Sequence, residues 1–248
     1  MTPSHFRAPE RSRLPRRVEP ELLDSLPVDD PQAVRSRQDL RRVNWLMGNA
    51  ALLRRALDRI VDTRTPPHLV ELGAGDGSLM LQLARHRATR WRDARVTLID
   101  RQPCVSETTL EGIRAQGWHV EVAASDVFDW LAQSGISSST VVIANLFMHH
   151  FAAPELTRLM HAIASRACAF VCCEPRRSHL ALAGSHLLGL LGCNAITRHD
   201  AVVSVRAGFR DAELTAMWPW SAGAAHAWQV SEASAGLFGH CFVAIRTP

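Results

Sequence analysis

The chain has 248 residues, of which 47% are hydrophobic, and this length suits one α/β domain with a modest extra segment. All 28 basic residues are arginine and tyrosine is absent, which excludes a P-loop lysine, Schiff-base chemistry and the Tyr–Lys pair of short-chain dehydrogenases. Residues 1–18 hold five arginines and one glutamate, so they alone carry the net charge of +4. The remaining residues are neutral overall, and no nucleic-acid partner is expected.

The six cysteines are predicted to be reduced, because four lie in apolar runs and two of them are adjacent. No signal peptide is recognised ahead of them, so we expect a cytoplasmic protein. The cysteines lack the paired spacing of a zinc site, and no metal is expected. The apolar stretch 179–196 is interrupted by polar residues and is too short for a transmembrane segment.

Residues 1–18 are rich in arginine and proline and are predicted to be a disordered tail. Residues 19–66 are expected to form an N-terminal helical cap of two helices. Asp30 is suited to cap the first helix, with Pro31 at its first position, and the apolar residues that follow recur at helical spacing. The main domain is expected to span residues 67–248.

From residue 67 onward, short apolar runs alternate with helical segments, which predicts an α/β fold with a parallel sheet and right-handed crossovers. Strands are expected at 68–73, 95–100, 120–126, 140–146 and 169–175. Helices are expected near 77–88, 103–116 and 153–165. After the fifth strand come an apolar helix at 178–192, a shorter helix at 211–217, and a terminal hairpin of 228–233 with 239–246.

The stretch VELGAGDGS, residues 70–78, places three glycines at alternate positions directly after the first strand. Glycine has no Cβ, so Gly73, Gly75 and Gly77 allow a sharp turn and let a ligand approach backbone N–H groups. Dinucleotide enzymes carry a related loop, G-x-G-x-x-G, but here the third glycine comes one residue early. A glycine loop alone can also be merely structural.

With Glu71 ahead of the loop and Asp100 at the end of the second strand, residues 68–175 resemble the class I S-adenosylmethionine-dependent methyltransferases. The resemblance implies a Rossmann-like, doubly wound, mostly parallel seven-stranded sheet with a C-terminal antiparallel hairpin. It also implies S-adenosylmethionine as cofactor. The residues that would bind this cofactor are Glu71, Gly73, Ala74, Gly75, Gly77, Asp100, Arg101, Asp126, Val127 and Asn145.

Within this resemblance, the loop would approach the methionine part of the cofactor and Glu71 would orient the loop or reach its amino group. The two oxygens of Asp100 would accept hydrogen bonds from both ribose hydroxyls. Asp126 and the backbone of Val127 would contact the adenine ring. Both aspartates have an alternative role as helix caps.

Two histidines follow the fourth predicted strand, and His149 or His150 is the candidate general base. A structural or capping role is the alternative for either. The segment Glu174 to Arg177 follows the fifth strand, where an arginine could bind an anionic substrate or pair with Glu174. The segment 197–209 is expected to be a pocket wall or an ion-pair network, with His199 as a further candidate base.

Residues 36–49, together with 174–177 and 198–209, are more loosely similar to bacterial methyltransferases of aromatic or polyketide-type metabolites. This similarity implies a phenolic or quinone-like small-molecule acceptor, with O-methylation preferred over C-methylation. Two alternatives remain open: a catalytically silent protein that binds the cofactor, and an RNA methyltransferase, which would need an arginine-rich surface and stacking aromatics. A homodimer is also possible.

Overall fold

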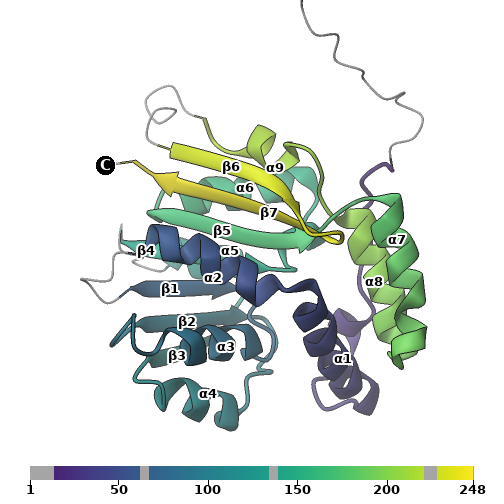
Figure 1. The fold of residues 1–248 in the computed structure, drawn as a ribbon, viewed down its shortest axis with the longest axis horizontal. Coiled ribbons are helices and arrows are strands. Elements are labelled where there is room, and N and C mark those ends of the chain that lie inside the picture. The colour runs from purple at the N-terminus through teal and green to yellow at the C-terminus, as the bar shows by residue number, and fades with distance from the viewer. Residues whose placement is uncertain (1–13, 62–66, 134–138, 221–227, 248) are drawn as a thin grey trace, which may run out of the picture.

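The computed structural model describes residues 14–61, 67–133, 139–220 and 228–247. These contain a seven-stranded sheet with strand order β3-β2-β1-β4-β5-β7-β6 (Figure 1). Five strands are parallel: β1 (His68–Leu72), β2 (Arg95–Asp100), β3 (His119–Ala124), β4 (Thr140–Asn145) and β5 (Ala169–Pro175). β7 (Gly239–Arg246) is antiparallel to β5 and to β6 (Trp228–Ala235). The predicted Rossmann-like sheet with its terminal hairpin is confirmed.

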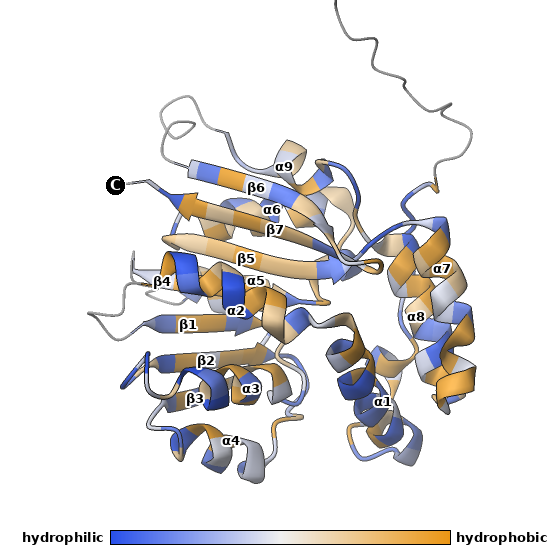
Figure 2. Cartoon of the chain, in the orientation of Figure 1, coloured by the Kyte–Doolittle hydropathy of each residue, from blue (hydrophilic) through white to orange (hydrophobic). Residues whose placement is uncertain are grey.

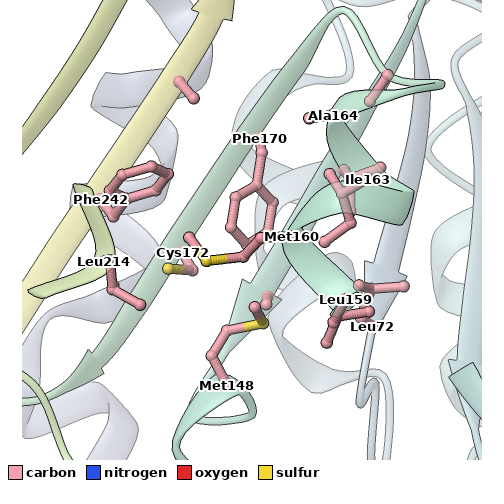
Figure 3. Packing of buried hydrophobic residues seen from close by; sticks show 14 of the residues in the cluster. Leu72, Met148, Leu159, Met160, Ile163, Ala164, Phe170, Cys172, Leu214 and Phe242 are labelled. Atoms are coloured by element: carbon pink, nitrogen blue, oxygen red, sulfur yellow. The ribbon is translucent and has the colours of Figure 1, made fainter. Parts of the chain in front are cut away.

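Helices cover both faces of the sheet, because successive residues of each buried strand point to opposite sides. On one face Leu69 packs with α2 (Asn49–Ile60), α3 (Ser78–Arg87) and α4 (Glu107–Arg114). On the other, Val70 and Leu72 pack with α5 (Val127–Gln133), α6 (Ala153–Ala164) and α9 (Glu213–Met217). Figure 3 shows the second cluster, in which Phe170 lies between Ile163 and Phe242.

Strand β5 lies deep in the sheet, and all seven of its residues are buried. Figure 2 shows a hydrophobic colour along most of this strand. Each large apolar side chain buried in this way contributes about 1.5–3 kcal/mol relative to remaining exposed. The central strands therefore form a rigid support for the loops that follow their carboxyl ends.

Three helices gather beyond the carboxyl ends of the parallel strands: α1 (Pro31–Met47), α7 (His179–His186) and α8 (Ala195–Ala207) (Figure 1). Asp30 caps α1 as predicted, since its side chain accepts hydrogen bonds from the backbone N–H groups of Gln32 and Ala33. The cap expected at 19–66 is not a single unit in the structure. Its first helix, α1, lies beyond the strand ends, whereas its second, α2, packs on the sheet through Leu53 and Leu57.

Three short 3-10 helices complete the described fold: η2 (Leu23–Ser25), η3 (Met148–His150) and η4 (Leu187–Leu191). The expected helix at 178–192 therefore consists of α7 followed by η4. The segment 197–209 lies between the helices expected at 178–192 and 211–217, and no helix was predicted for it. In the structure it forms most of α8. Asn194 caps α8 by accepting a hydrogen bond from the backbone N–H of Thr197.

The N-terminal segment, residues 14–26, lies against α8 and the loops at the strand ends. Arg16 donates hydrogen bonds to the carbonyl oxygens of Ala207 and Phe151. Arg177 donates to the carbonyl oxygen of Leu14. The prediction of a disordered tail is therefore wrong for residues 14–18, and residues 1–13 lie outside the described part of the chain.

All six cysteines are free thiols, as predicted. Cys173 and Cys241 face each other in register across β5 and β7. Within the described ranges, no helix combines the length and the apolar character needed to cross a bilayer.

Asp200 of α8 is buried and accepts hydrogen bonds from the backbone N–H groups of Leu22 and Leu23, at 2.8 and 3.0 Å. We predict that Asp200→Ala lowers the free energy of unfolding by about 2 kcal/mol or more, because two bonds to a charged acceptor are lost. Urea denaturation measures this change. Glu111→Ala, at an exposed position of α4, is the charge control and should have little effect. Equal stability of the two variants would contradict this anchoring role.

Candidate functional site

The strand order reverses between β1 and β4, which start crossovers in opposite directions. In open α/β sheets, ligands bind outside the carboxyl ends of the strands at such a point. β1 and β4 are hydrogen-bonded neighbours, with Leu72 opposite Ala144. The loop that starts at Gly73 and the side chain of Asn145 therefore leave the sheet side by side.

The glycines of the loop have different structural roles. All three have positive φ, +67° at Gly73, +54° at Gly75 and +71° at Gly77. A Cβ at Gly73 would lie 2.1 Å from the Phe147 ring, whereas a Cβ at Gly75 would meet nothing within 4 Å. Gly73 is thus required for packing, and only Gly75 presents open backbone.

Two adjoining cavities lie at this edge. The glycine-loop cavity, of about 190 Å³, is lined by the loop and by side chains that include Arg37, Glu71 and Asn145. The Asp126 cavity, of about 850 Å³, is lined by residues that include Arg101, Asp126 and Val127. The residues that line both cavities are Glu21, Asp24, Gly73, Asp100, Leu146 and His150.

Two buried polar atoms beside the glycine-loop cavity have no hydrogen-bond partner. One is Oε2 of Glu71 and the other is Nη1 of Arg37. Burial, together with the charges of Asp76 and Asp100, raises the pKa of Glu71 well above its usual value. A buried polar atom without a partner is costly, so both atoms are suited to a ligand with a cationic donor and an anionic acceptor.

Asp100 lies at the junction of the two cavities. Its Oδ2 accepts a hydrogen bond of 2.8 Å from the backbone N–H of Gly75, and its Oδ1 accepts one of 2.9 Å from that of Gln102. Each carboxylate oxygen has a second lone pair that can accept from a ligand. Asp126 similarly accepts from the backbone N–H of Phe128 at the start of α5, at 2.8 Å. The expected capping role of Asp126 is present, and it leaves the other oxygen available.

The structure brings most of the predicted cofactor residues to these cavities. Those at the glycine-loop cavity are Glu71, Gly73, Ala74, Gly75, Asp100 and Asn145, and those at the Asp126 cavity are Gly73, Asp100, Arg101, Asp126 and Val127. Gly77 is not among the lining residues. A Cβ at Gly77 would lie 3.2 Å from side-chain atoms of Leu98, Val105 and Thr109, so this glycine allows α3 to pack closely on its neighbours.

Asn145 is held by two asparagines from the junction of α1 and α2. The Asn49 side chain donates a hydrogen bond of 2.9 Å to Oδ1 of Asn145, and the Asn145 amide is 3.4 Å from Oδ1 of Asn44. Asn44 also lines the glycine-loop cavity. The end of β4 is therefore connected directly to the cap helix α1.

His149 is buried between two carboxylates. Its Nδ1 is 2.7 Å from Glu174 and its Nε2 is 3.2 Å from Glu21. Burial alone would lower the pKa of His149, but the hydrogen bonds and charges of these carboxylates raise it to about 9. The imidazole is therefore protonated at neutral pH and cannot accept a proton.

His150 has the opposite electrostatic character. Burial and the neighbouring positive charge of His149 lower the pKa of His150 to about 4. The two rings are in an edge-to-face arrangement with centroids 4.3 Å apart. His150 lines both cavities and is neutral at physiological pH. Of the two candidate bases, only His150 can therefore accept a proton while the N-terminal segment is in place.

The turn that carries both histidines is fixed by Glu174 at the end of β5. Its carboxylate accepts hydrogen bonds from the backbone N–H groups of Phe147, Met148 and His149, at 3.1, 2.9 and 3.3 Å. Leu146, just before them, has a φ of +51°, a conformation that residues with a Cβ rarely adopt. Such strain is retained where the surrounding structure determines the backbone, often at functional sites.

The remaining polar candidates lie away from the cavities. Arg177 is buried and donates to Glu213 and to the carbonyl oxygen of Gly208, so it does not form the pair with Glu174 that was one of the two alternatives for this segment. His199 is half-exposed, with Nδ1 3.0 Å from Asp200, and it lines neither cavity. This segment behaves as a hydrogen-bond network, although Ser204 on the same helix reaches the glycine-loop cavity.

Comparisons with known proteins agree with this geometry. Residues 69–168 match a family model described as "Methyltransferase domain". This segment contains the glycine loop and the ends of β1 to β4. Residues 69–168 therefore carry a methyltransferase domain. No curated protein matches the sequence.

Solved structures share the fold of this methyltransferase at low sequence identity. The plantazolicin methyltransferase BpumL, in complex with SAH, has a TM-score of 0.60 at 10% identity, over 88% of this chain and 92% of that chain. An O-methyltransferase family protein from Burkholderia thailandensis scores 0.58 at 16% identity, over 89% of this chain and 61% of that chain. The mitomycin 7-O-methyltransferase MmcR scores 0.55 at 18% identity, over 88% and 59%. This chain thus spans about three fifths of the last two proteins.

Several residues at the methyltransferase site were missed by the sequence analysis. Glu21 lies at the start of the predicted helical cap. Arg37 and Asn44 lie in its first predicted helix, where no site residue was predicted. No sequence signal distinguishes Arg37 from the other arginines, because its buried Nη1 beside the cavity is visible only in the structure. Nothing local in the sequence marks Glu21, because its partner His149 lies 128 residues away.

We predict that Gly73→Ala destabilises the ligand-free methyltransferase more than Gly75→Ala. Both substitutions place a Cβ on a backbone with positive φ, which costs about 1–2 kcal/mol. Only Gly73→Ala also pushes against the Phe147 ring, which adds about 1–3 kcal/mol. Urea denaturation of the two variants measures the difference, with Gly75→Ala as the matched control. Equal unfolding free energies would contradict the assigned packing role of Gly73.

Proposed function

We propose that this methyltransferase transfers a methyl group from S-adenosylmethionine to a hydroxyl oxygen of a small phenolic, quinone-like or polyketide-type metabolite. The observation that carries the proposal is the pair of unpartnered atoms beside the glycine-loop cavity, Oε2 of Glu71 and Nη1 of Arg37. When bound, the cofactor supplies a methyl group activated by a positively charged sulfur.

The two unpartnered atoms fit the amino-acid end of the cofactor, which has an ammonium group and a carboxylate. Glu71 would accept from the ammonium group, which would also favour its ionised form. The Arg37 guanidinium would donate to the carboxylate. Asp100, at the junction of the cavities, would accept from the ribose hydroxyls, and Asp126 would then lie on the adenine side.

The lining of both cavities is acidic. Carboxylates outnumber guanidinium groups among the residues of each cavity. Such a lining attracts a cationic cofactor and repels a polyanion. It therefore supports a small acceptor over RNA, which needs a basic surface for its phosphates.

The acceptor must approach the activated methyl group in line with the sulfur, so the residues around it chiefly align the two reactants. Asn145, His150 and Ser204 line the glycine-loop cavity together with residues of α1 and of the N-terminal segment, and we place the acceptor on this side. His150 is the neutral imidazole of this side and is suited to assist removal of the acceptor proton. Two of the compared structures bear O-methyltransferase names, which supports oxygen over carbon as the methylated atom.

A catalytically silent cofactor-binding protein is the alternative of a different class. It would need the cofactor residues but not a neutral imidazole at the acceptor side. The position of His150 at both cavities therefore favours the enzyme.

We predict that Glu71→Gln and Arg37→Gln each weaken binding of S-adenosylhomocysteine about 10-fold or more, because each loses a charge-assisted hydrogen bond. Neither change should affect binding of methylthioadenosine, which lacks the amino-acid end. Asp100→Ala should weaken both ligands. Isothermal titration calorimetry measures all affinities. If Glu71→Gln and Arg37→Gln weaken both ligands equally, the orientation proposed for the cofactor is wrong.

We predict that His150→Ala lowers kcat by about 100-fold for an accepted phenol while leaving the affinity for S-adenosylhomocysteine within twofold of the unchanged protein, because help with proton removal acts only in the transition state. The acceptor would first be found in a panel of phenols and hydroxyquinones, scored by release of S-adenosylhomocysteine. His119→Ala, exposed on β3, is the matched control. Wild-type turnover of His150→Ala would contradict the role of His150.

A further inference from the structure

Three side chains from distant parts of the chain converge beside the glycine-loop cavity: Glu21, His149 and His150. Oε1 of Glu21 is 3.2 Å from Nε2 of His149 and 3.4 Å from Nε2 of His150. One ligand atom from each residue lies within 4.8 Å of the other two. Ligands about 2.0–2.2 Å from a tetrahedral zinc ion are separated by ~3.3–3.6 Å, which is close to the two distances from Glu21.

The surroundings of the three residues are those of a supported metal site. The other ring nitrogen of His149, Nδ1, donates a hydrogen bond of 2.7 Å to Glu174. Glu174 itself accepts hydrogen bonds from three backbone N–H groups. A ligating histidine commonly has such a carboxylate behind it, which fixes the orientation of the ring. The Ser204 hydroxyl donates to Oε1 of Glu21, the same oxygen that faces both histidines, and helps to fix that carboxylate.

Other histidine–carboxylate pairs in the described ranges lack this arrangement. His240 lies 2.7 Å from Glu232, but the Glu232 carboxylate is also taken up by Thr215 and the backbone of Leu214. Glu21, His149 and His150 form the group of three whose spacing suits a metal ion among the residues that the structure describes.

We propose that Glu21, His149 and His150 bind a zinc-class divalent cation whose fourth coordination position opens to the glycine-loop cavity. Two imidazoles and one carboxylate are ligands that suit zinc, whereas Mg²⁺ and Ca²⁺ prefer oxygen ligands alone. The cation takes the place of the proton that His149 shares with Glu21, since a ligating nitrogen must be unprotonated.

The fourth position holds water or an oxygen of the acceptor. Only the assignment of an acceptor oxygen to this position rests on the proposed function. In the metal-loaded protein, His150 acts as a metal ligand. A cation there lowers the pKa of a bound hydroxyl oxygen, which is the requirement for O-methylation at neutral pH. The metal ion would therefore act at the same step for which the neutral imidazole is suited in the metal-free protein.

Calorimetric titration of Zn²⁺ into the chelator-treated full-length chain tests the site, with bound metal counted by elemental analysis. We expect one tightly bound equivalent for the unchanged protein, and at least ~100-fold weaker binding for Glu21→Gln and for His150→Ala. His119→Ala should bind normally, and Mg²⁺ should not compete. Circular dichroism shows whether each variant is folded, and Glu21→Gln replaces the carboxylate by an amide of the same shape.

Cobalt substitution separates this site from the six free thiols, which also bind zinc. The proposal expects a tetrahedral Co²⁺ spectrum without sulfur-to-cobalt charge transfer. Zinc binding that persists in both variants, a sulfur charge-transfer band, or no binding would each overturn the proposal. Neither cofactor nor acceptor is needed, so these outcomes leave the proposed function standing, and loss of S-adenosylhomocysteine binding would not affect the metal result.

Discussion

The carboxylate of Glu174, buried at the end of β5, is the interaction on which the arrangement of the site depends. Burying a charged carboxylate is costly unless hydrogen bonds compensate it. Glu174 obtains them from the backbone of residues 147–149 and from the His149 ring. The turn after β4 is thereby fixed, and with it the position of Phe147 against Gly73 and of His150 at both cavities.

The same constraint explains how the N-terminal segment is held in place. His149 is charged, and Glu21 from that segment supplies the second carboxylate that stabilises the charge. Asp200 of α8 also accepts hydrogen bonds from the backbone N–H groups of Leu22 and Leu23. The cap over the cavities is thus attached through buried ionic hydrogen bonds rather than through a continuous apolar core.

The fold was largely predictable from the sequence because its signals are local. Apolar β-branched runs mark the parallel strands, Asp30 with Pro31 marks the start of α1, and the glycine loop marks the turn after β1. α8 was missed because its sequence mixes β-branched valines with Arg198, His199 and Asp200, so it lacks a regular apolar stripe. Residues 14–18 were expected to be disordered because their partners lie almost two hundred positions away, as in the contact of Arg16 with Ala207.

The sequence predicted only those residues of the candidate site that lie at the ends of the strands. Glu71, Asp100, Asp126 and Asn145 each lie at or near the carboxyl end of a predicted strand, so topology alone brings them together. Sequence reasoning could not assign different protonation states to adjacent histidines, because the carboxylates that charge His149, Glu21 and Glu174, lie 128 and 25 positions away from it in the chain. Nor could it separate the packing role of Gly73 from the open backbone at Gly75, since that depends on the Phe147 ring.

The central claim is that the cofactor lies across both cavities with its amino-acid end between Glu71 and Arg37. A crystal structure of the protein with S-adenosylhomocysteine tests this most directly. The account predicts the ligand ammonium group within hydrogen-bond distance of Oε2 of Glu71, its carboxylate on Nη1 of Arg37, and both ribose hydroxyls on Asp100. A ligand bound with its amino-acid end toward Asp126, or outside these cavities, would contradict the account.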